Sequence, residues 1–257
     1  MFRPTASCIW NSFRSSDKGC LVLTGGREEE RIQLRKELLD NHSPNLKFCE
    51  EITVDAFVVN LDNPYGNIGC VIMASGLGKR FGGNKLMADF CGQPMIVRVL
   101  DATEGIFSER VIVTRHEDVA KNAAERGVAV ILHQMPHRSD TIRLGMEQMM
   151  DTDHCIFCPG DQPLLSQETL ASMALAAAND RNTIWRISWE ENRGAPIIFP
   201  RWSYDELLHL PEGKGGAVVV REHENSVRCV PAGCSEELVD ADTPEILESL
   251  VRFTLRK

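Results

Sequence analysis

The sequence predicts an α/β fold in which a mostly parallel, twisted sheet carries helices on both faces. From residue 68 onward, short apolar runs alternate with segments of helical periodicity, and this alternation is typical of such a sheet. The chain has 257 residues, of which 43% are hydrophobic and 25% charged, and this suits one large globular domain with an additional segment. We expect that segment to be a small N-terminal α/β extension.

The extension is predicted to cover residues 1–67, and the main domain residues 68–257. Residues 20–40 predict a strand, a glycine turn and a charged helix, and residues 52–67 predict a strand that runs into a linker. The stretch Asn63-Pro64-Tyr65-Gly66 marks the boundary, because asparagine, proline and glycine favour turns. No motif in the extension indicates a role.

The main domain is predicted element by element from its apolar pattern. Strands are expected at 69–74, 110–114, 128–132, 154–158, 195–199 and 226–230, with a further segment at 182–188. Helices are expected near 93–105, 117–126, 139–150, 166–178, 203–209 and 215–222, with a last one after the loop near residue 240. In such sheets ligands bind beyond the carboxyl ends of the strands, so the loops after 69–74 and 154–158 are the first places for a site.

Composition limits the possible partners. The net charge of −9 argues against a broad nucleic-acid surface, and no apolar run approaches the roughly 18 residues of a membrane span. Nine scattered cysteines favour reduced thiols over a disulfide framework. The N-terminus is rich in arginine and serine, as in a transit peptide, but shows no clear amphipathic period or cleavage site, so we expect a cytoplasmic protein.

The loop after strand 69–74 combines conformational freedom with positive charge. It holds glycines at 76, 78, 82 and 83 and the cations Lys79, Arg80 and Lys85. Glycine lets the backbone approach a ligand closely, and successive N–H groups form a concave anion site. The spacing fits neither the dinucleotide fingerprint, which needs its third glycine one residue earlier, nor the Walker loop, which needs lysine directly after its second glycine. A solvated glycine-rich hairpin is the alternative.

Two acidic stretches are expected to accompany this loop. Asp161 follows the apolar strand 154–158, and a carboxylate at that position beside a phosphate loop suits Mg²⁺. Asp240 and Asp242 precede the last helix. Each aspartate also has a purely structural interpretation, because Asp161 is able to cap a turn, and Asp242 or Thr243 the helix that begins with Pro244.

The pattern Gly76-x-x-x-Arg80-x-Gly82-x-x-Lys85 after a strand resembles the signature of the nucleotidyltransferase-A-like fold. Within it, the chain is similar to the MobA/MocA-like NTP transferases, molybdenum cofactor cytidylyltransferase-like enzymes with a nucleotide-diphospho-sugar transferase fold. Gly160-Asp161-Gln162-Pro163 resembles the G-D-x-P motif of that family, and Asp240-Ala241-Asp242-Thr243-Pro244-Glu245 its D-x-D-T-P-E element. The resemblance covers roughly residues 68–252.

The resemblance implies a role for each matching residue. Arg80, Lys85 and Asp161 would be catalytic, with Asp161 and Asp242 as Mg²⁺ ligands. The nucleotide would contact Ala74, Ser75, Gly76, Leu77, Gly78, Lys79, Gly82, Gln134 and Thr141. The acceptor pocket would comprise Arg193, Gly194, Pro196 and Asp240. Ser139 or Thr141 is alternatively a helix cap, and His133 and His137 are expected to be surface residues of a loop.

The resemblance further implies transfer of CMP from CTP to molybdopterin with release of pyrophosphate, and a molybdoenzyme or its chaperone as an expected partner. The side chain of Ser75, where GTP-using relatives carry a second glycine, favours a pyrimidine. Ala195 stands in place of a histidine and His137 in place of a glycine, so the acceptor pocket departs from the family pattern. A guanylyltransferase, a sugar-1-phosphate nucleotidyltransferase, or a non-catalytic nucleotide-binding module for a molybdoenzyme are the alternatives.

Overall fold

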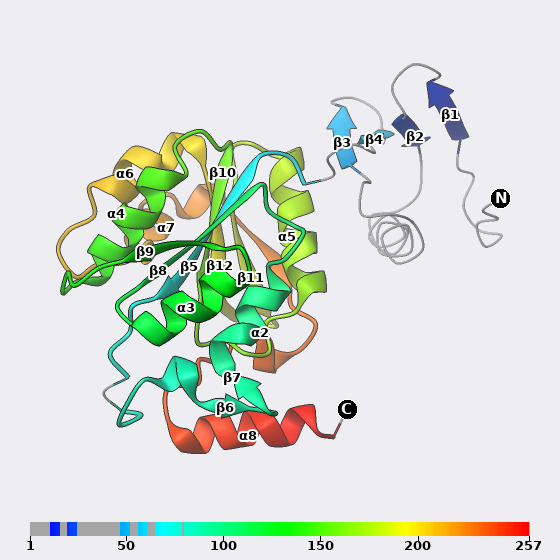
Figure 1. Ribbon diagram of the computed structural model, residues 1–257. Coiled ribbons are helices and arrows are strands. Elements are labelled where there is room, and N and C mark those ends of the chain that lie inside the picture. Colours follow the sequence, from blue (N-terminus) through cyan, green and yellow to red (C-terminus); the bar gives the residue numbers. More distant parts are fainter. Residues whose placement is uncertain are drawn as a thin grey trace. The chain divides into compact units, whose positions relative to one another are not determined.

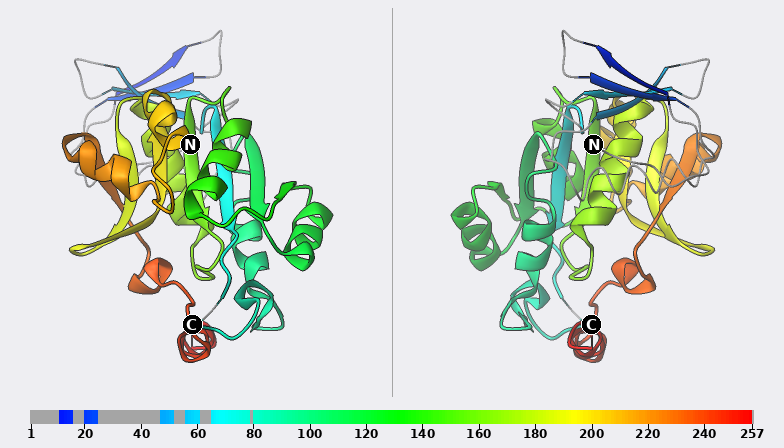
Figure 2. Two further views of the ribbon diagram at one scale, coloured as in Figure 1. Left: turned by 90° about the vertical axis from the view of Figure 1, so that its left-hand side faces the viewer. Right: turned by 90° about the vertical axis from the view of Figure 1, so that its right-hand side faces the viewer.

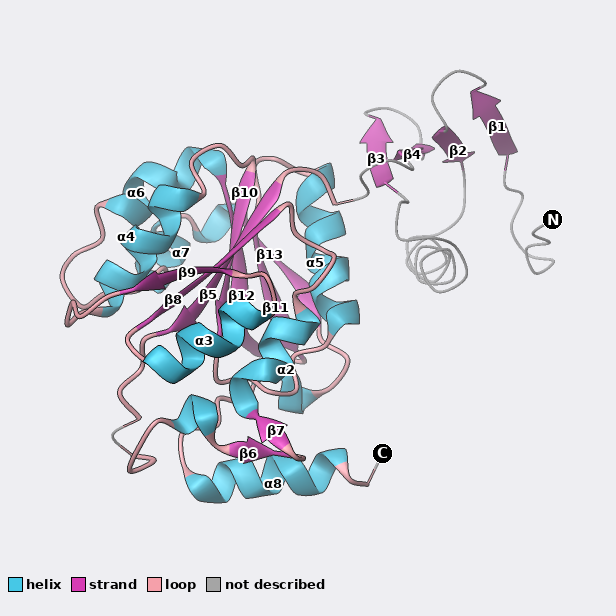
Figure 3. Cartoon of the chain, viewed as in Figure 1, coloured by secondary structure: helices cyan, strands magenta, loops and turns pink. Residues whose placement is uncertain are grey.

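The structure, a computed structural model, describes residues 65–78 and 80–256 together with the strand residues 11–15, 20–24, 47–51 and 56–60. The chain separates into two compact units, Met1–Gly66 and Asn67–Lys257. Figure 1 labels the elements, and Figure 3 colours them by type.

The described part of the first unit is an antiparallel sheet of four strands in the order β1-β2-β4-β3. These strands are β1 (Asn11–Ser15), β2 (Cys20–Thr24), β3 (Lys47–Glu51) and β4 (Ala56–Asn60). Strands β2 and β4 lie within the segments predicted to hold strands, whereas β1 and β3 were not predicted. The helix predicted before residue 40 lies outside the described residues.

The second unit is built on a seven-stranded sheet in the order β13-β11-β12-β10-β5-β8-β9. Only β12 is antiparallel to its neighbours, so the prediction of a mostly parallel sheet is confirmed. The strands are β5 (Ile68–Ala74), β8 (Glu109–Thr114), β9 (Ala129–Leu132), β10 (His154–Pro159), β11 (Ile184–Trp189), β12 (Asn192–Pro200) and β13 (Val227–Pro231). A short hairpin, β6 (Asp89–Phe90) and β7 (Gln93–Pro94), was not predicted.

Helices cover both faces of this sheet, as predicted (Figure 2). One layer consists of α4 (Arg138–Gln148), α6 (Tyr204–Leu208) and α7 (Ala217–Glu222), whose apolar side chains share a core with the sheet. The other layer consists of α2 (Met95–Ala102), α3 (Glu117–Glu125) and α5 (Gln167–Asn179), which contact the strands and one another. The chain ends in α8 (Pro244–Thr254). Helix α4 begins at Arg138, one residue before the predicted start.

The burial of the two central strands, β5 and β10, explains why the sequence predicts them from apolar runs. All six residues of β10 are buried, as are six of the seven in β5. Because helices cover both faces, neither strand has a polar side, and their sequences are nearly continuous apolar runs. No helix among the described residues is long and apolar enough to cross a membrane.

Close packing between α4 and β5 requires a glycine in the helix. A Cβ at Gly145 would lie 2.4 Å from Val71 Cγ1, so helix and strand are closer there than a side chain allows. Helical propensity alone would favour alanine at this position by about 1 kcal/mol. Overpacking of a filled core costs about 1–3 kcal/mol, which exceeds that gain.

We therefore expect Gly145→Ala to lower the free energy of unfolding by about 1–2 kcal/mol, and the melting temperature by about 2–4 °C for each kcal/mol. Thermal unfolding measured by circular dichroism tests this. The control is Ser172→Ala on the exposed side of α5, where a smaller improvement in propensity meets no packing limit. A more stable Gly145→Ala variant would contradict the close approach.

Candidate active site

The glycine loop follows β5 directly at the carboxyl edge of the sheet. Gly78 has a φ of +57°, and its carbonyl accepts hydrogen bonds from the N–H groups of Phe81 (2.8 Å) and Gly82 (3.0 Å). A Cβ at Gly78 would lie only 2.0 Å from the Gly83 carbonyl oxygen. The loop therefore needs glycine at 78 both for its backbone angle and for its close turn on itself.

Neighbouring elements anchor the loop at both ends. His116 Nε2 donates to the Gly76 carbonyl at 2.9 Å, just before the turn. After the turn, Asn84 Nδ2 donates to both carboxylate oxygens of Asp118 in α3, and Asn84 Oδ1 accepts from the Leu86 N–H. These contacts fix where the one-turn helix η1 (Lys85–Met87) begins, and so direct Lys85 inward.

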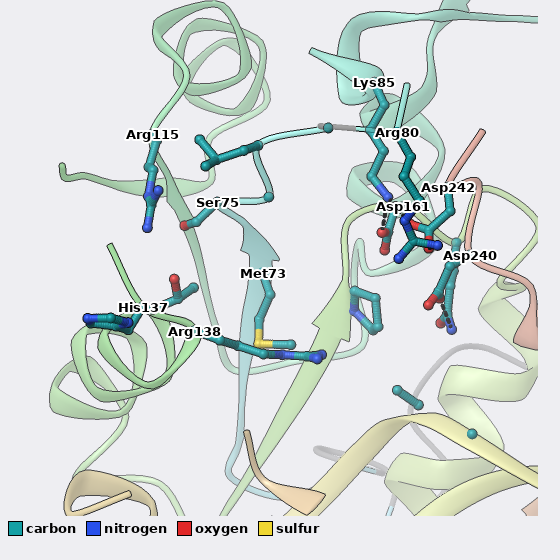
Figure 4. Close-up of a pocket in the computed structure, with 18 of the residues that line it drawn as sticks. Met73, Ser75, Arg80, Lys85, Arg115, His137, Arg138, Asp161, Asp240 and Asp242 are labelled. Atoms are coloured by element: carbon teal, nitrogen blue, oxygen red, sulfur yellow. Dashed lines mark hydrogen bonds and ion pairs between the residues drawn. The ribbon is translucent and has the colours of Figure 1, made fainter. Parts of the chain in front are cut away.

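Lys85 joins two acidic loops that are distant in sequence. Its Nζ lies 2.6 Å from Asp161 Oδ2 and 2.7 Å from Asp242 Oδ1, and its side chain is 8% exposed. Arg80, which is largely exposed, contacts the other oxygen of Asp242 at 3.1 Å. The structure thus brings together the four residues predicted to form the reaction centre (Figure 4).

The charges in this cluster shift one another's pKa values. Burial lowers the pKa of Lys85, but attraction and hydrogen bonds from Asp161 and Asp242 outweigh it, and the net shift is upward. The hydrogen bond from Lys85 lowers the pKa of Asp242. At neutral pH these two groups are therefore an ammonium and a carboxylate in contact.

Asp240 lies next to this cluster, and its pKa shifts in the opposite direction to that of Asp242. Burial, followed by the charge of Asp161, raises its pKa, while the hydrogen bond from Gln162 Nε2 (2.9 Å) opposes the shift. The two acidic loops are also joined through their backbones, because the Ala241 N–H donates to the Asp161 carbonyl at 2.8 Å. The position of Asp242 relative to Asp161 is therefore fixed by main chain as well as by Lys85.

These residues line a cavity of about 770 Å³, a size typical of small-molecule sites. The acids that line it, Asp161, Asp240 and Asp242, all lie at one end (Figure 4). Arg115 and His137 lie at the opposite end, and Arg138 points toward the middle. Met73 and the glycine loop lie between the two ends, and Ser75 lies on the side of Arg115.

Ser75, the first residue after β5, is held at the far end by two hydrogen bonds. Its hydroxyl lies 3.0 Å from the Val113 carbonyl and 2.7 Å from His133 Nε2. The Met135 N–H donates to His133 Nδ1, which places the ring proton on Nε2, so Ser75 accepts from His133 and donates to Val113. Burial, then the charge of Arg115, lowers the pKa of His133 and keeps it neutral.

The structure places most of the predicted residues at the cavity. Those that line it are Ser75, Gly76, Leu77, Gly78, Arg80, Lys85, Thr141, Asp161, Gly194, Asp240 and Asp242. Lys79 lies outside the described residues. Three predicted nucleotide contacts are not among the lining residues: Ala74 is buried in the sheet, Gln134 is exposed, and Gly82 is exposed on the outer part of the turn.

The acceptor turn was predicted wrongly. Residues 193–196 belong to β12 rather than to a turn, and only Gly194 and Ala195 of this stretch line the cavity. Arg193 is paired with Glu224 at 2.7 Å, and Pro196 is buried after a cis peptide bond. In a strand successive side chains point to opposite faces, so four consecutive residues do not all face one ligand.

Two further expectations need correction, while that for His137 holds. His133 is only 9% exposed, and it bonds Ser75 beneath the cavity. His137 is a partly exposed loop residue, as expected, and it also lines the cavity and pairs with Glu212 at 2.8 Å. Neither Ser139 nor Thr141 caps α4: residue 137 is the N-cap, and Ser139 Oγ accepts from the Gly213 N–H.

Sequence reasoning gave no role to several residues that line the cavity, among them Met73, Arg115 and Leu238. A signal for Arg115 was present, because it is the first residue after a predicted strand, at the edge where ligands bind. Leu238 lies in the one-turn helix η4 (Ser235–Leu238), and no sequence pattern brings it to the site.

The comparison with protein families decides the relationship. Residues 70–227 match the family described as the MobA-like NTP transferase domain. The chain belongs to this family. The matched residues therefore form a nucleotidyltransferase-family domain. They include the glycine loop and Asp161.

Curated relatives match over shorter stretches. The chain is 33% identical over 96 residues to 3-deoxy-manno-octulosonate cytidylyltransferase of Herminiimonas arsenicoxydans, covering 35% of this chain and 38% of that protein. It is 31% identical over 133 residues to the bifunctional protein GlmU of Desulfitobacterium hafniense strain Y51, covering 50% and 27%. The chain thus spans well under half the length of these relatives.

Solved structures share the fold. Rv0371c of Mycobacterium tuberculosis H37Rv superposes with a TM-score of 0.64 at 22% identity, covering 72% of this chain and 98% of that one. A structure of the same protein with manganese has a TM-score of 0.61 at 20% identity, with 72% and 98% covered. CMP:2-keto-3-deoxy-manno-octonic acid synthetase complexed with CTP has a TM-score of 0.60 at 15% identity, with 74% and 99% covered.

The loop geometry predicts that alanine substitutions at two glycines of this loop, Gly78 and Gly83, have different effects on nucleotide binding. Gly78→Ala places a Cβ at a positive φ and against the Gly83 carbonyl, whereas a Cβ at Gly83 meets nothing within 4 Å. We expect Gly78→Ala to weaken nucleoside triphosphate binding at least tenfold, about 1.4 kcal/mol, because the loop cannot keep its shape. Gly83→Ala is the matched control, with binding expected within about twofold of wild type.

Isothermal titration calorimetry with each nucleoside triphosphate measures both affinities. Equal binding by the two variants would mean that the turn at Gly78 does not shape the binding site.

Proposed function

We propose that this protein is a Mg²⁺-dependent nucleotidyltransferase that transfers CMP from CTP to a molybdopterin-type acceptor and releases pyrophosphate. The observation that carries the proposal is the position of Lys85 between Asp161 and Asp242, beside a glycine loop suited to bind phosphates. Membership of the MobA-like NTP transferase domain family supports the same activity. We place it in the cytoplasm, with a molybdoenzyme or its chaperone as a possible recipient of the product.

The two aspartates fit a divalent ion. Asp161 and Asp242 each direct a carboxylate oxygen at one cation, the Lys85 ammonium, so the pair already surrounds a positive charge. Mg²⁺ usually takes one or two carboxylates and completes its shell with water and substrate phosphates. When bound, the ion neutralises charge on the phosphate oxygens of the reacting group.

The chain's own residues would position the reactants and neutralise charge. Backbone N–H groups of the glycine loop and Arg80 hold the β- and γ-phosphates, and Lys85 stabilises the α-phosphoryl as charge builds on it. An oxygen of the acceptor's terminal phosphate forms a bond to the α-phosphorus. The bond from that phosphorus to the bridging oxygen breaks, and pyrophosphate leaves with the electron pair.

The choice of CTP rests on Ser75 and on the relatives. A side chain at this position narrows the space where GTP-using proteins of the family carry glycine. The names of two similar proteins include cytidylyltransferase and CTP. A guanylyltransferase on molybdopterin is the alternative for the nucleotide.

The acceptor is the less supported half of the proposal. The cavity end that holds Gly194, Ala195, Leu238 and Asp240 is where we place it, next to the aspartate pair. Ala195 departs from the family's histidine there, which favours keeping a sugar-1-phosphate acceptor as a second candidate. The same departure motivates the third, a nucleotide-binding module without transfer activity.

A titration with the four nucleoside triphosphates and Mg²⁺, followed by a pyrophosphate-release assay with acceptor, tests the function. We expect CTP to raise the melting temperature most and pyrophosphate to appear with molybdopterin. Lys85→Ala and Asp161→Ala should each lose at least about 2.7 kcal/mol of transition-state stabilisation, a hundredfold in rate. Binding without release would favour the module, and near-wild-type turnover in either variant would refute the assigned roles.

Lys85 also predicts how metal binding responds to mutation. In the absence of nucleotide its ammonium already neutralises the aspartate pair, so a divalent ion must compete with it. We expect Lys85→Met, which preserves the chain length, to bind Mn²⁺ at least tenfold more tightly without nucleotide while losing transfer activity, because both carboxylates lose the buried ammonium between them and Asp242 keeps its contact with the exposed Arg80.

Electron paramagnetic resonance of free Mn²⁺ measures this affinity directly. Lys214→Met, which removes an exposed lysine that does not line the cavity, is the control for net charge. Weaker Mn²⁺ binding by Lys85→Met would show that the aspartates do not form the metal site.

A further inference from the structure

The far end of the cavity differs chemically from the end that holds the aspartates. Three adjacent parallel strands, β5, β8 and β9, end there, and the first residue after each is Ser75, Arg115 and His133. Ser75 and His133 are bonded to each other, and Arg115 lies close enough to lower the pKa of His133 by its charge. Ser75 and Arg115 line the cavity there, with His133 beneath them, and we call these three residues the β8 wall.

Only one member of the β8 wall has a hydrogen-bond donor to spare. Ser75 has spent its proton on the Val113 carbonyl, and His133 uses Nε2 on Ser75 and Nδ1 on the Met135 N–H. Among the described residues, the guanidinium of Arg115 has no hydrogen bond and no acidic partner, and its Nε is buried without a partner. Arg115 thus lines the cavity as a charged hydrogen-bond donor that has no partner among the described residues.

The arrangement of the two ends decides which part of a nucleotide meets Arg115. If the triphosphate lies on the glycine loop with its α-phosphate at Lys85, the acceptor must approach on the side of Asp161 and Asp240. The nucleoside then extends the other way, past Leu77 and toward the β8 wall. Leu77 is 54% exposed and lines the cavity, as does Pro136, so two apolar side chains are available to contact a flat ring.

We infer that Arg115 reads the nucleobase, and that it selects a base with two adjacent hydrogen-bond acceptors. This rests on the proposed function and deepens it by assigning the base specificity to a residue. A guanidinium presents donors in a planar fork and accepts nothing.

Each base meets that fork differently. Cytosine offers O2 and N3, and guanine offers O6 and N7, as adjacent acceptors. Uracil carries a proton on N3, and adenine places an amino donor beside N7, so each of these sets a donor against the fork. Arg115 therefore excludes UTP and ATP, while the size of the pocket beside Ser75 distinguishes cytosine from guanine.

The test compares ligands that share phosphates but differ in the base. Binding of CTP, UTP, ATP and inorganic tripolyphosphate is measured by calorimetry with Mg²⁺, for the wild-type chain and for Arg115→Met, which keeps the apolar stem and removes the donors. For wild type we expect CTP to bind at least tenfold more tightly than UTP. In Arg115→Met that ratio should fall to about one, while tripolyphosphate binding stays within about twofold.

Two further variants control for charge. Arg115→Lys keeps the charge but not the planar fork, so we expect it to lose CTP discrimination as well. Arg126→Met removes an exposed arginine that is paired with Asp101 and does not line the cavity, and it should behave as wild type. If Arg115→Met unfolds, the lysine variant carries the test by itself.

The outcomes separate this inference from the proposed function. If Arg115→Met weakens CTP and tripolyphosphate equally, Arg115 contacts phosphate, and the inference is wrong while nucleotide binding stands. Unchanged CTP binding, or a wild-type preference for UTP or ATP, also overturns it. If the wild-type chain binds none of the nucleoside triphosphates, the proposed function fails first.

Discussion

The ammonium of Lys85 holds the site together, because among the described residues it is the one positive charge in direct contact with both acidic loops. Asp161 follows β10 and Asp242 precedes α8, and two like charges so close would repel without a cation between them. The contacts are short and Lys85 is nearly buried, so water screens the attraction poorly. Because the carboxylates of Asp161 and Asp242 already surround one cation, a divalent ion is able to compete with Lys85 for them.

Backbone hydrogen bonds also fix the positions of the two acidic loops. The Ala241 N–H bonds the Asp161 carbonyl, and Gly160 continues the pairing of β10 with β5 through the Met73 carbonyl. These bonds do not depend on side-chain rotamers. They fix the main chain of both acidic loops relative to β5, and Lys85 fixes the carboxylates that these loops carry.

Charge is divided along the cavity in a protein that is acidic as a whole. The acids that line it lie at one end and are largely balanced by Lys85 and Arg80, while Arg115 and Arg138 have no acidic partner among the described residues. An anionic ligand thus meets a locally positive surface despite the net charge of −9. In the proposed function, this division separates a nucleoside end from an acceptor end.

The sequence by itself determined the sheet, its helices and the central residues of the site. Strands buried on both faces appear as apolar runs, and the spacing of Gly76, Arg80 and Lys85 after such a run indicates a phosphate loop rather than a dinucleotide or Walker loop. Only the tertiary structure decided that Arg193 and Pro196 miss the cavity, that His133 is buried, and that Arg115 lines the cavity without a partner. The physical reason is that strand order, side-chain direction and pairing depend on neighbours distant in the chain, which no local pattern encodes.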